Sequence, residues 1–416
     1  MMRGRLKADS LKAGVLFEPP LSKSDAIRLL FVQHACGARL EQFNSHAPED
    51  VLVCRAALAR LAASSGECDL SMGVGAAPFR FILALASVDA LKVTHLDAER
   101  TLRSRPHGPL VGSLEAALGP RGLRIDSRSW PLTVDARGLR LQRKLVFSIV
   151  PESSQYVTAL LLAGARLVAC GSCSEVSVVL QGEPASAGYL GLTREWLEAA
   201  GFAIAVQANA WQVTGYRAGA ISRAVPPDWS SAAYLAVWAW RCGGGVRVER
   251  RGGHPDAAVL TVLEEAGVRS EIDGHSTLRL SGPLRRGLRA CAAECPDLIP
   301  TLAALAMAAP SASVFESVGI LRGKESDRVE FIERLAASAG GRATAREDKL
   351  ILEPPARLAA RVEIETGGDH RRALAGSVLA ALGEVEVFFD DIACVAKSFP
   401  DYWDEIDRCG ATLEVC

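Results

Sequence analysis

Six consecutive residues of this sequence, Gly-Lys-Glu-Ser-Asp-Arg at positions 323–328, bring together two cations and two carboxylates. Lys324 and Arg328 could hold an anionic group, and Arg328 could grip it with two parallel hydrogen bonds. These residue types suit the binding of an anionic group, although one such motif on its own is more often an exposed, well-capped surface helix.

A helix is predicted to position this motif. Apolar residues recur at helical spacing from Val329 to Ala336, and Gly323 is typical of the preceding turn. Asp327 with Glu330 three residues later predicts a capping box, and the helix would run to Gly340. Because backbone N–H groups at a helix start are unpaired and the helix dipole is positive there, an anion would be favoured at this point.

The same arrangement recurs at other predicted helix starts, where a turn carrying cations, hydroxyls or an amide precedes an apolar helix. The segments are Ser22–Ser24 with Arg28, Gly73–Arg80, Arg100–Arg105, Ser153–Gln155 and Gly367–Arg372. Each alone has an ordinary interpretation as an N-cap, a solvated surface cation or a buried histidine. Together, in a nearly neutral protein, they predict a ligand that carries several anionic groups.

The charge balance and the apolar pattern exclude several classes of function. Lys plus Arg number 47 against 48 Asp plus Glu, so no basic surface for nucleic acid or an anionic membrane is expected. Apolar runs are too short to span a bilayer, and the N-terminus lacks the apolar core of a signal peptide. The cytoplasm is therefore the expected location.

The 11 cysteines are irregularly spaced, which suits reduced thiols better than a disulfide framework. A zinc site shared by Cys170, Cys173, Cys291 and Cys295 is an alternative. It is disfavoured because neither pair has a histidine nearby.

A repeated unit indicates the fold class. An amphipathic helix, a glycine and a strand recur at residues 58–70, 114–125, 194–206, 260–272, 331–352 and 404–415. The later copies are about 70 residues apart, which suits a unit of a few strands and two helices rather than a solenoid repeat. We therefore expect an α/β protein of two domains, with three such units in each.

Proline pairs mark the expected domain boundaries. One strand is predicted over Leu11–Phe17, before the first pair at 19–20, and the second pair is at 226–227. The first domain would span 21–225, and the second would combine 1–20 with 226–416. The hinge would lie near 19–21 and 224–228. A cleft between the domains is the expected ligand site.

From Leu21 to the C-terminus, the chain resembles the EPSP synthase (3-phosphoshikimate 1-carboxyvinyltransferase) family. The motifs that carry the resemblance are Ser22-Lys23-Ser24 with Arg28, Arg105-Pro106, Ser153-Ser154-Gln155, Ser186 with Tyr189 and Thr193, Asp228-Trp229-Ser230-Ser231-Ala232, Asp297-Leu298-Ile299-Pro300, Lys324-Glu325-Ser326-Asp327-Arg328, Asp369-His370-Arg371 and Ala396-Lys397-Ser398-Phe399-Pro400. No single motif is specific, but the ordered set is. The resemblance implies the enolpyruvyl transferase fold, in which each of two domains has three βαβαββ units around a pseudo-threefold axis.

The resemblance implies a transferase of the shikimate pathway, which leads to chorismate and the aromatic amino acids. The enolpyruvyl group of phosphoenolpyruvate would pass to the 5-hydroxyl of shikimate 3-phosphate through a tetrahedral intermediate, with release of phosphate. No metal and no other cofactor would be needed, the partners would be these small molecules, and the protein would be a monomer. Such an addition needs a proton for carbon, a base at the hydroxyl and cations around the anionic groups.

By resemblance, each candidate residue has a role. Asp297 would deprotonate the 5-hydroxyl, Glu325 would protonate the methylene carbon, and the remaining catalytic residues would be Lys23 and Lys324. Phosphoenolpyruvate, mainly on the second domain, would be bound by Lys23, Ala76, Arg105, Arg328, Arg371 and Lys397. Shikimate 3-phosphate, mainly on the first domain, would be bound by Lys23, Ser24, Arg28, Ser153, Ser154, Gln155, Ser186, Asp297 and Lys324. Because cations surround Glu325, its acid role requires a compensating environment.

Two places depart from the family pattern. The family usually has an Asn-Ala-Gly-Thr-like turn before the arginine that corresponds to Arg80, whereas this chain has Val-Gly-Ala-Ala at 74–77, or a short deletion. A glycine that meets the phosphate of phosphoenolpyruvate would become Ala76, so reduced sensitivity to glyphosate is expected. An inhibition constant as low as that of a glycine-bearing relative would contradict this. Asp25 would place an acid near a phosphate site.

Two other functions remain as alternatives. The sister enolpyruvyl transferase that acts on UDP-N-acetylglucosamine shares the fold, but it relies on a loop cysteine, and the region around Arg105 has none. A non-catalytic descendant that binds phosphorylated metabolites is suggested by the altered turn at 74–78. The charged set retained at Lys23, Asp297, Glu325 and elsewhere argues against it.

Overall fold

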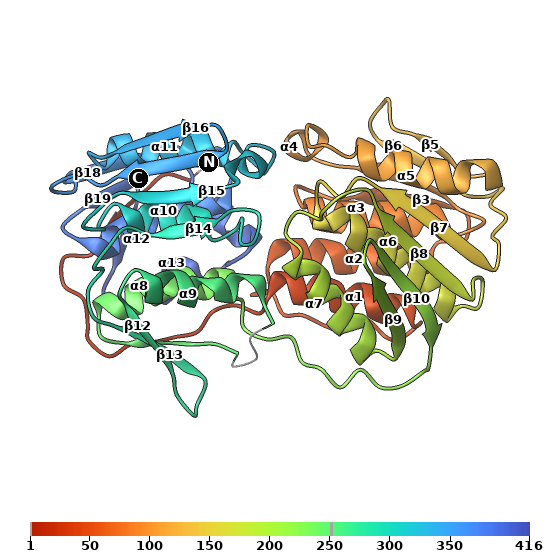
Figure 1. Ribbon diagram of the computed structural model, residues 1–416, viewed down its shortest axis with the longest axis horizontal. Helices are drawn as coiled ribbons and strands as arrows, with labels where there is room; N and C mark the ends of the chain where they lie inside the picture. Colours follow the sequence, from red (N-terminus) through yellow and green to blue (C-terminus); the bar gives the residue numbers. More distant parts are fainter. Residues whose placement is uncertain (1, 250–252) are drawn as a thin grey trace. The chain divides into compact units, whose positions relative to one another are not determined.

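The computed structural model describes residues 2–249 and 253–416. The chain forms two compact units, each with its own hydrophobic core (Figure 1). Unit 1 consists of Met1–Ser22, His46–Glu49 and Pro226–Cys416, and unit 2 of Lys23–Ser45 and Asp50–Val225. Among the described residues, no helix combines the length and the apolar character needed to cross a bilayer.

The two proline-containing connections between the units lie side by side. Leu21 and Pro227 form an antiparallel bridge. The amide of Ser22 donates to the carbonyl of Pro226 (2.7 Å), and the amide of Asp228 donates to the carbonyl of Pro20 (2.8 Å). The prolines that predicted a boundary are therefore part of a paired connection, and motion about it stays a prediction.

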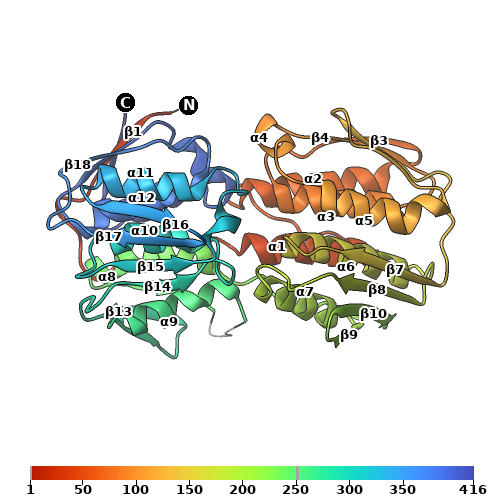
Figure 2. The ribbon, with the colours of Figure 1, turned by 45° about the horizontal axis from the view of Figure 1, so that its top comes forward.

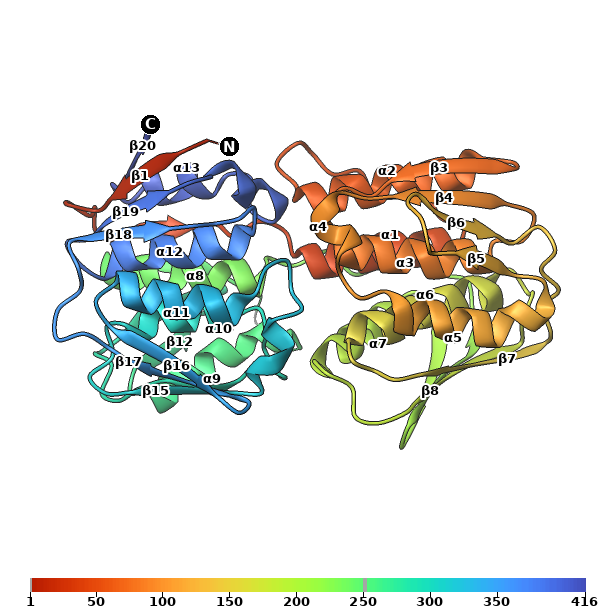
Figure 3. The ribbon, with the colours of Figure 1, turned by 90° about the horizontal axis from the view of Figure 1, so that it is seen from above.

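Within its described residues, unit 1 contains three four-stranded sheets. The strands, in their order across each sheet, are β18 (Arg361–Ile364), β19 (Glu386–Phe389), β1 (Gly4–Lys7) and β20 (Thr412–Val415); β12 (Arg269–Ile272), β13 (Thr277–Ser281), β11 (Gly245–Arg247) and β2 (Leu16–Phe17); and β14 (Arg289–Cys291), β15 (Ser313–Glu316), β17 (Lys349–Glu353) and β16 (Arg342–Arg346). Its helices are α8 (Trp229–Arg241), α9 (Ala258–Glu265), α10 (Ile299–Ala306), α11 (Arg328–Ser338), α12 (His370–Leu382) and α13 (Tyr402–Asp407). In Figure 3, α8, α10, α11 and α12 lie side by side between sheets.

Unit 2 contains two four-stranded sheets in the described residues. They are β7 (Lys144–Ile149), β8 (Glu175–Leu180), β10 (Ala210–Tyr216) and β9 (Phe202–Gln207); and β3 (Glu67–Ser71), β4 (Val93–Asp97), β6 (Leu132–Asp135) and β5 (Arg124–Asp126). Its helices are α1 (Lys23–Ala35), α2 (Glu49–Ala63), α3 (Ala76–Val88), α4 (Arg100–Arg103), α5 (Gly108–Leu118), α6 (Ser154–Ala169) and α7 (Gly188–Ala199). Figure 2 shows the longer helices running side by side, with one sheet on each side of them.

All five sheets follow one plan. Each has one parallel pair at an edge and two antiparallel pairs. A parallel pair needs a crossover connection, and α3, α6, α10 and α12 each lie between the two strands of such a pair in the sequence. This repeated plan and the mixed composition of helices and small sheets confirm the predicted α/β fold class.

Unit 2 has one sheet fewer than three βαβαββ units would give. The predicted helix–glycine–strand segment at 58–70 is present as α2 and β3, but β3 pairs with β4 of the following unit. Only residues 64–66 separate α2 from β3, and residues 36–48 contain no strand. The chain is too short at these two places to form another sheet, so that unit consists of the helices α1 and α2 without a sheet of its own.

The strand predicted at Leu11–Phe17 is mostly wrong. Only Leu16–Phe17 is a strand there, because Gly14 turns the chain with a positive φ of 76°. The longer strand is Gly4–Lys7, which pairs with β19 and β20 at the other end of the chain. A four-residue strand with two basic residues gives little signal in sequence, since its stability comes from those distant partners.

The central helices are buried because they are apolar on every side. In α3, every residue but Ala77 is buried, including Arg80. A helix of this kind belongs in the middle of a layer rather than at a surface. Such helices carry the polar residues at their first turns, where the candidate site residues lie.

Candidate functional site

The start of α11 has the N-cap that the sequence predicted. Asp327 Oδ1 accepts hydrogen bonds from the amides of Val329 and Glu330, both at 3.0 Å. The Glu330 carboxylate pairs with Arg334 (2.8 Å), one turn along the helix. The Asp327 N-cap is therefore confirmed, whereas the Glu330 carboxylate, which would complete the predicted capping box, is paired with Arg334 instead.

Two arginines of unit 1 hold the carboxylate of Asp297. Arg328 donates from Nη1 to Oδ1 (2.9 Å), and Arg371 donates from Nη2 to Oδ2 (2.9 Å). Arg371 also donates to the backbone carbonyl of Asp297 (3.1 Å). Burial alone would raise the pKa of the Asp297 carboxyl, but Arg371 and Lys324 outweigh it and hold that pKa well below its usual value. Asp297 is therefore ionised, as a general base must be before it takes a proton.

Arg328 lies between two carboxylates, since its Nε also donates to Asp369 Oδ2 (3.3 Å). Asp369 is fully buried and caps α12, where its Oδ1 accepts from the amide of Arg371 (2.9 Å). Burial alone would lower the pKa of Arg328, but Asp369 and Asp297 raise it above its usual value. The guanidinium of Arg328 is thus a permanent positive charge with a fixed orientation.

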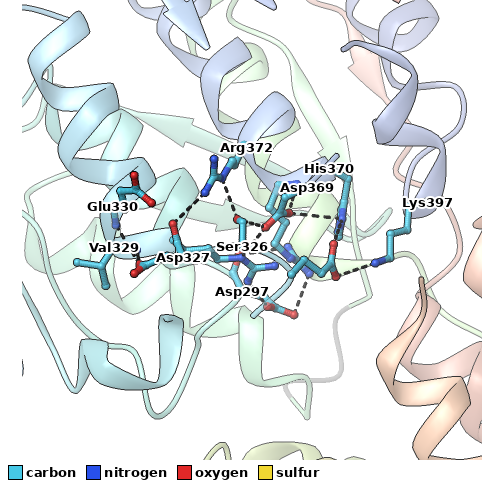
Figure 4. A network of polar contacts seen from close by, with 12 residues as sticks. Asp297, Ser326, Asp327, Val329, Glu330, Asp369, His370, Arg372 and Lys397 are labelled. Carbon is cyan, nitrogen blue, oxygen red and sulfur yellow. Dashed lines mark hydrogen bonds and ion pairs between the residues drawn. The ribbon is translucent and has the colours of Figure 1, made fainter. Parts of the chain in front are cut away.

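Glu325 is held by two further groups of unit 1. Lys397 Nζ lies 2.9 Å from Oε1, and His370 Nδ1 lies 3.1 Å from Oε2 (Figure 4). Burial alone would raise the pKa of the Glu325 carboxyl, but Lys397 and His370 hold it well below its usual value. Glu325 is therefore ionised. The cations near it in the sequence had indicated this, and an ionised Glu325 cannot donate a proton until its environment changes.

Glu325, Asp369 and His370 also resemble a metal-binding group, because each offers a ligand atom within 4.8 Å of the other two. However, Lys397 and Arg328 already pair with the two carboxylates. A divalent cation would have to enter beside these charges, which Coulomb repulsion opposes. The expectation that the protein needs no metal stays a prediction.

In unit 2, the ammonium group of Lys23 pairs with Asp50 Oδ2 at 3.0 Å. Asp50 is buried near the start of α2 and was not among the predicted residues. A Cβ added to Gly75 would come within 2.7 Å of Asp50 Oδ1, so the glycine of the altered turn packs directly against the Asp50 carboxylate. Ala76 follows as the first residue of α3 and is buried.

The guanidinium of Arg28 is buried among acceptors of unit 2. It donates to Thr193 Oγ1 (2.9 Å) and to the backbone carbonyls of Ser24 (2.8 Å) and Tyr189 (3.2 Å). Burial lowers the pKa of Arg28 to about 10, so it remains charged at neutral pH. Arg28 therefore links the turn at Ser24 to the first turn of α7, next to the predicted Ser186.

Arg80 connects two turns that carry predicted site residues. Its Nη1 donates to Gln155 Oε1 (2.6 Å), and its Nη2 donates to the backbone carbonyl of Pro106 (2.8 Å), which follows Arg105. The ring of Tyr156 lies 4.8 Å from the guanidinium, and the Tyr156 hydroxyl donates to the same carbonyl (2.8 Å). The sequence placed Arg80 in a helix start but did not assign it this linking role.

The Ser153–Gln155 turn caps α6 as the sequence predicted. Ser153 is the N-cap, and its hydroxyl accepts from the amide of Gln155 (3.3 Å). Ser154 is buried in the first turn of the helix. Ser186 also precedes a helix, α7, and it has a positive φ of 58° that fixes the direction of its side chain in the turn.

The carboxylate of Asp25 is paired within unit 2, and its place near a phosphate site stays a prediction. It is fully buried and accepts from Trp196 Nε1 (2.7 Å), and Arg223 Nη2 lies 3.7 Å away. Arg223 also stacks on the ring of Trp196 at 4.8 Å. Asp25 therefore lies in the packing between α1 and α7, where its charge is paired.

Replacing Trp196 by Phe tests this structural role. The variant removes a hydrogen bond to a buried carboxylate, so the free energy of unfolding should fall by about 1.5–3 kcal/mol. The KM for the phosphorylated substrate that the resemblance implies should not change. Trp211→Phe on β10, a partly buried tryptophan of the same unit, is the matched control in chemical unfolding followed by circular dichroism. A raised KM would show that Asp25 contributes to the substrate site.

Acidification should destabilise unit 1 through its paired carboxylates. The pKa values of Asp297, Glu325 and Asp369 lie below those of an unfolded chain, so their contribution is present above pH ~4 and is lost as pH falls further. The unfolded chain then binds more protons than the folded one. Urea unfolding at about pH 7, 4 and 3 should show the loss between pH 4 and 3, and Asp297→Asn should reduce it. Equal pH dependence in both proteins would contradict the assignment to Asp297.

The predicted site residues fall into two groups. Unit 1 contains Asp297, Lys324, Glu325, Arg328, Arg371 and Lys397, and unit 2 contains Lys23, Ser24, Arg28, Ala76, Arg105, Ser153, Ser154, Gln155 and Ser186. Within unit 1, ion pairs connect Asp297 to Arg328 and to Arg371, and another connects Glu325 to Lys397. The sequence missed Asp50, because one acid at a helix start has no distinguishing signal.

Comparisons with known proteins identify the family of this chain. A family model described as EPSP synthase (3-phosphoshikimate 1-carboxyvinyltransferase) matches residues 21–406. The 3-phosphoshikimate 1-carboxyvinyltransferase of Methanopyrus kandleri is 30% identical over 425 residues, covering 95% of each chain. That of Halobacterium salinarum is 31% identical over 344 residues, covering 80% of this chain and 78% of the relative.

Solved structures show the same fold. The EPSP synthase of Acinetobacter baumannii matches with a TM-score of 0.75 and 22% identity, covering 100% of both chains. The enolpyruvyl transferase NikO of Streptomyces tendae matches with a TM-score of 0.68 and 14% identity, covering 100% of this chain and 99% of the other. Since the family model spans nearly the whole sequence, the chain belongs to the EPSP synthase family.

Proposed function

We infer that this protein transfers the enolpyruvyl group of phosphoenolpyruvate to the 5-hydroxyl of shikimate 3-phosphate. The products are 5-enolpyruvylshikimate 3-phosphate and phosphate. The observation that best supports this is the pair of carboxylates in unit 1, Asp297 and Glu325, each held by two basic side chains. Such a set suits acid-base chemistry on anionic substrates.

The carboxylates divide the proton transfers between them. Asp297 takes the proton of the 5-hydroxyl, whose oxygen bonds to C2 of phosphoenolpyruvate, while Glu325 delivers a proton to C3. A tetrahedral intermediate results. Phosphate then leaves C2 as C3 returns its proton to Glu325, and Asp297 passes its proton to the departing phosphate or to solvent. Every atom of the two substrates is thus accounted for in the two products.

Glu325 must be protonated before the first step, and the substrate can bring this about. Phosphoenolpyruvate carries a carboxylate and a phosphate, which would pair with Lys397 and Arg328. Each new pairing weakens the hold of these cations on Glu325 and adds negative charge beside it, and both effects raise its pKa. His370, 3.1 Å from Glu325, would orient the carboxyl as it gains the proton.

The residues of unit 2 would bind shikimate 3-phosphate and complete the phosphoenolpyruvate set. The hydroxyls and amide of Ser153, Ser154 and Gln155 stand at the start of α6, where the helix dipole favours a phosphate. Lys23 adds a cation, and Asp50 keeps that cation oriented through the 3.0 Å ion pair. We infer that transfer uses residues of both units, in a cytoplasmic monomer without a cofactor.

Phosphate release tests the proposed function. The purified protein, mixed with shikimate 3-phosphate and phosphoenolpyruvate, should release one phosphate per enolpyruvyl group transferred. UDP-N-acetylglucosamine in place of shikimate 3-phosphate should give no release, and release with it would favour the sister activity. Binding of shikimate 3-phosphate without any phosphate release would instead favour a non-catalytic descendant.

A further inference from the structure

Arg372 stands apart from the predicted site but contacts the loop that carries Glu325. It is the third residue of α12 and is half-buried. Its Nε donates to Ser326 Oγ (2.8 Å), and its Nη2 donates to the backbone carbonyl of Asp327 (3.0 Å). Figure 4 shows the side chain reaching from α12 to these two residues. One guanidinium thus binds the two residues that directly follow Glu325.

Two further contacts keep the guanidinium in this position. Its Nη1 donates to the backbone carbonyl of Glu365 (3.2 Å), and its planar group lies 5.3 Å from the ring centre of Phe331 on α11. Arg372 therefore joins α11, the segment before α12 and the loop at 326–327. A rigid fork with several donors can make these contacts at once, whereas a single ammonium group cannot.

Ser326 connects Arg372 to the charged network of Asp369 and Arg328. Its hydroxyl accepts from Arg372 and donates to Asp369 Oδ2 (2.8 Å). Asp369 in turn pairs with Arg328 and caps α12. The loop is therefore fixed against the helix start by a chain of polar contacts that runs from Arg372 through Ser326 to the buried Asp369.

We propose that Arg372 is a positioning residue that holds Glu325 in place for proton transfer through its bonds to Ser326 and Asp327. The proposal rests on the proposed function, since it needs Glu325 to act on a bound substrate. The contacts of Arg372 described above are with residues 326–327, Glu365 and Phe331, so it acts on Glu325 through the loop. A displacement of the carboxyl by about 1 Å is enough to slow a reaction by about 100-fold.

Replacing Arg372 by Met tests the proposal, because Met can still pack on Phe331 but cannot donate. We expect kcat to fall by about 10- to 100-fold, with the KM for shikimate 3-phosphate unchanged. Arg372→Lys should recover part of the loss, because a lysine can reach one acceptor of the two. Ser326→Ala should lower kcat as well, since it removes the middle of the chain of contacts.

Arg334→Met is the matched control. Arg334 lies on α11 and pairs with Glu330 and Glu365, so the variant removes a nearby surface cation without touching residues 326–327. If Arg372→Met and the control have the same kcat, the proposal is wrong. A loss of kcat that is matched by a rise in KM also overturns the proposal, and so does an Arg372→Lys variant whose kcat is no higher than that of Arg372→Met. Either result would be explained by a general loss of structure in unit 1.

The wild-type protein separates the two inferences. If it releases no phosphate from the two substrates, the proposed function fails and the role of Arg372 in it falls with it. If the wild type is active and the Arg372 variants match the control, only the positioning role fails. Should Arg372→Met not fold, the kcat values of Arg372→Lys and Ser326→Ala are compared with those of the wild type and the control instead, because each of these variants removes a smaller part of the network.

Discussion

Replacing Glu325 by Gln should lower kcat by about 10²- to 10⁴-fold, the usual range for loss of a general acid. Gln keeps the shape and still accepts a hydrogen bond, but it has no proton to give to the methylene carbon. The affinity for shikimate 3-phosphate should change little, because the loss lies in the transition state. Phosphate release at saturating substrates gives kcat, and calorimetric titration gives the affinity.

A neighbouring glutamate provides the control for this variant. Glu330 is in the first turn of α11 and half-exposed, where it pairs with Arg334. Glu330→Gln should leave both kcat and affinity close to those of the wild type. If Glu325→Gln lowers kcat and affinity in equal measure, Glu325 binds substrate and the proton comes from elsewhere. His370, which contacts the same carboxylate, would then be the next candidate.

Replacing Asp369 by Ala should cost about 3–5 kcal/mol of stability, the usual effect of removing one partner of a buried ion pair. Asp369 is 1% exposed and makes three kinds of contact: an ion pair with Arg328, a hydrogen bond from Ser326 and the cap of α12. Without it, the guanidinium of Arg328 is buried with one carboxylate fewer. Hydrogen exchange of the α12 amides should report this loss locally.

Two variants separate the charge from the cap. Asp369→Asn keeps an oxygen for the amide of Arg371 and loses only the charge, so it should be less destabilised than Asp369→Ala. Asp327→Ala removes a comparable but more exposed N-cap and should cost about 1 kcal/mol. Equal stability of the Ala variants at 327 and 369 would contradict the importance of the pair with Arg328.

Much of the site could be predicted because helix starts have local signals. Asp327, Ser153 and Asp369 are all N-caps in the structure, and each precedes the helix that the spacing of apolar residues indicated. Helix capping depends on residues within one turn, so the sequence contains the necessary information. The resemblance to the family added the roles, which local patterns do not specify.

Contacts between residues far apart in the sequence could not be predicted. Asp25 follows Ser24 in sequence, but its partners, Trp196 and Arg223, lie far along the chain. The direction of a side chain at a helix start follows from tertiary packing, which neither charge nor spacing reveals. Asp50 was missed for the same reason, because nothing near it in sequence indicates Lys23 as its partner.

The repeat pattern in the sequence also could not predict the reduced number of sheets in unit 2. The segment at 58–70 has the expected helix, glycine and strand, so its sequence resembles that of a complete unit. What it lacks is chain length, since α2 passes to β3 across residues 64–66 alone. The helix, glycine and strand of a repeat can therefore recur in a sequence even where the other strands of that repeat are absent.

The strand β1 has a consequence for how the protein is made. It leaves the ribosome before unit 2, yet it pairs with β19 and β20, which are synthesised after unit 2 (Figure 3). At roughly 5–20 residues per second, its partners follow after tens of seconds. Unit 2 is nearly continuous in sequence and can fold in that interval, whereas the sheet around β1 cannot close until β19 and β20 emerge. The strand β1 therefore remains without its partners while unit 2 is being made.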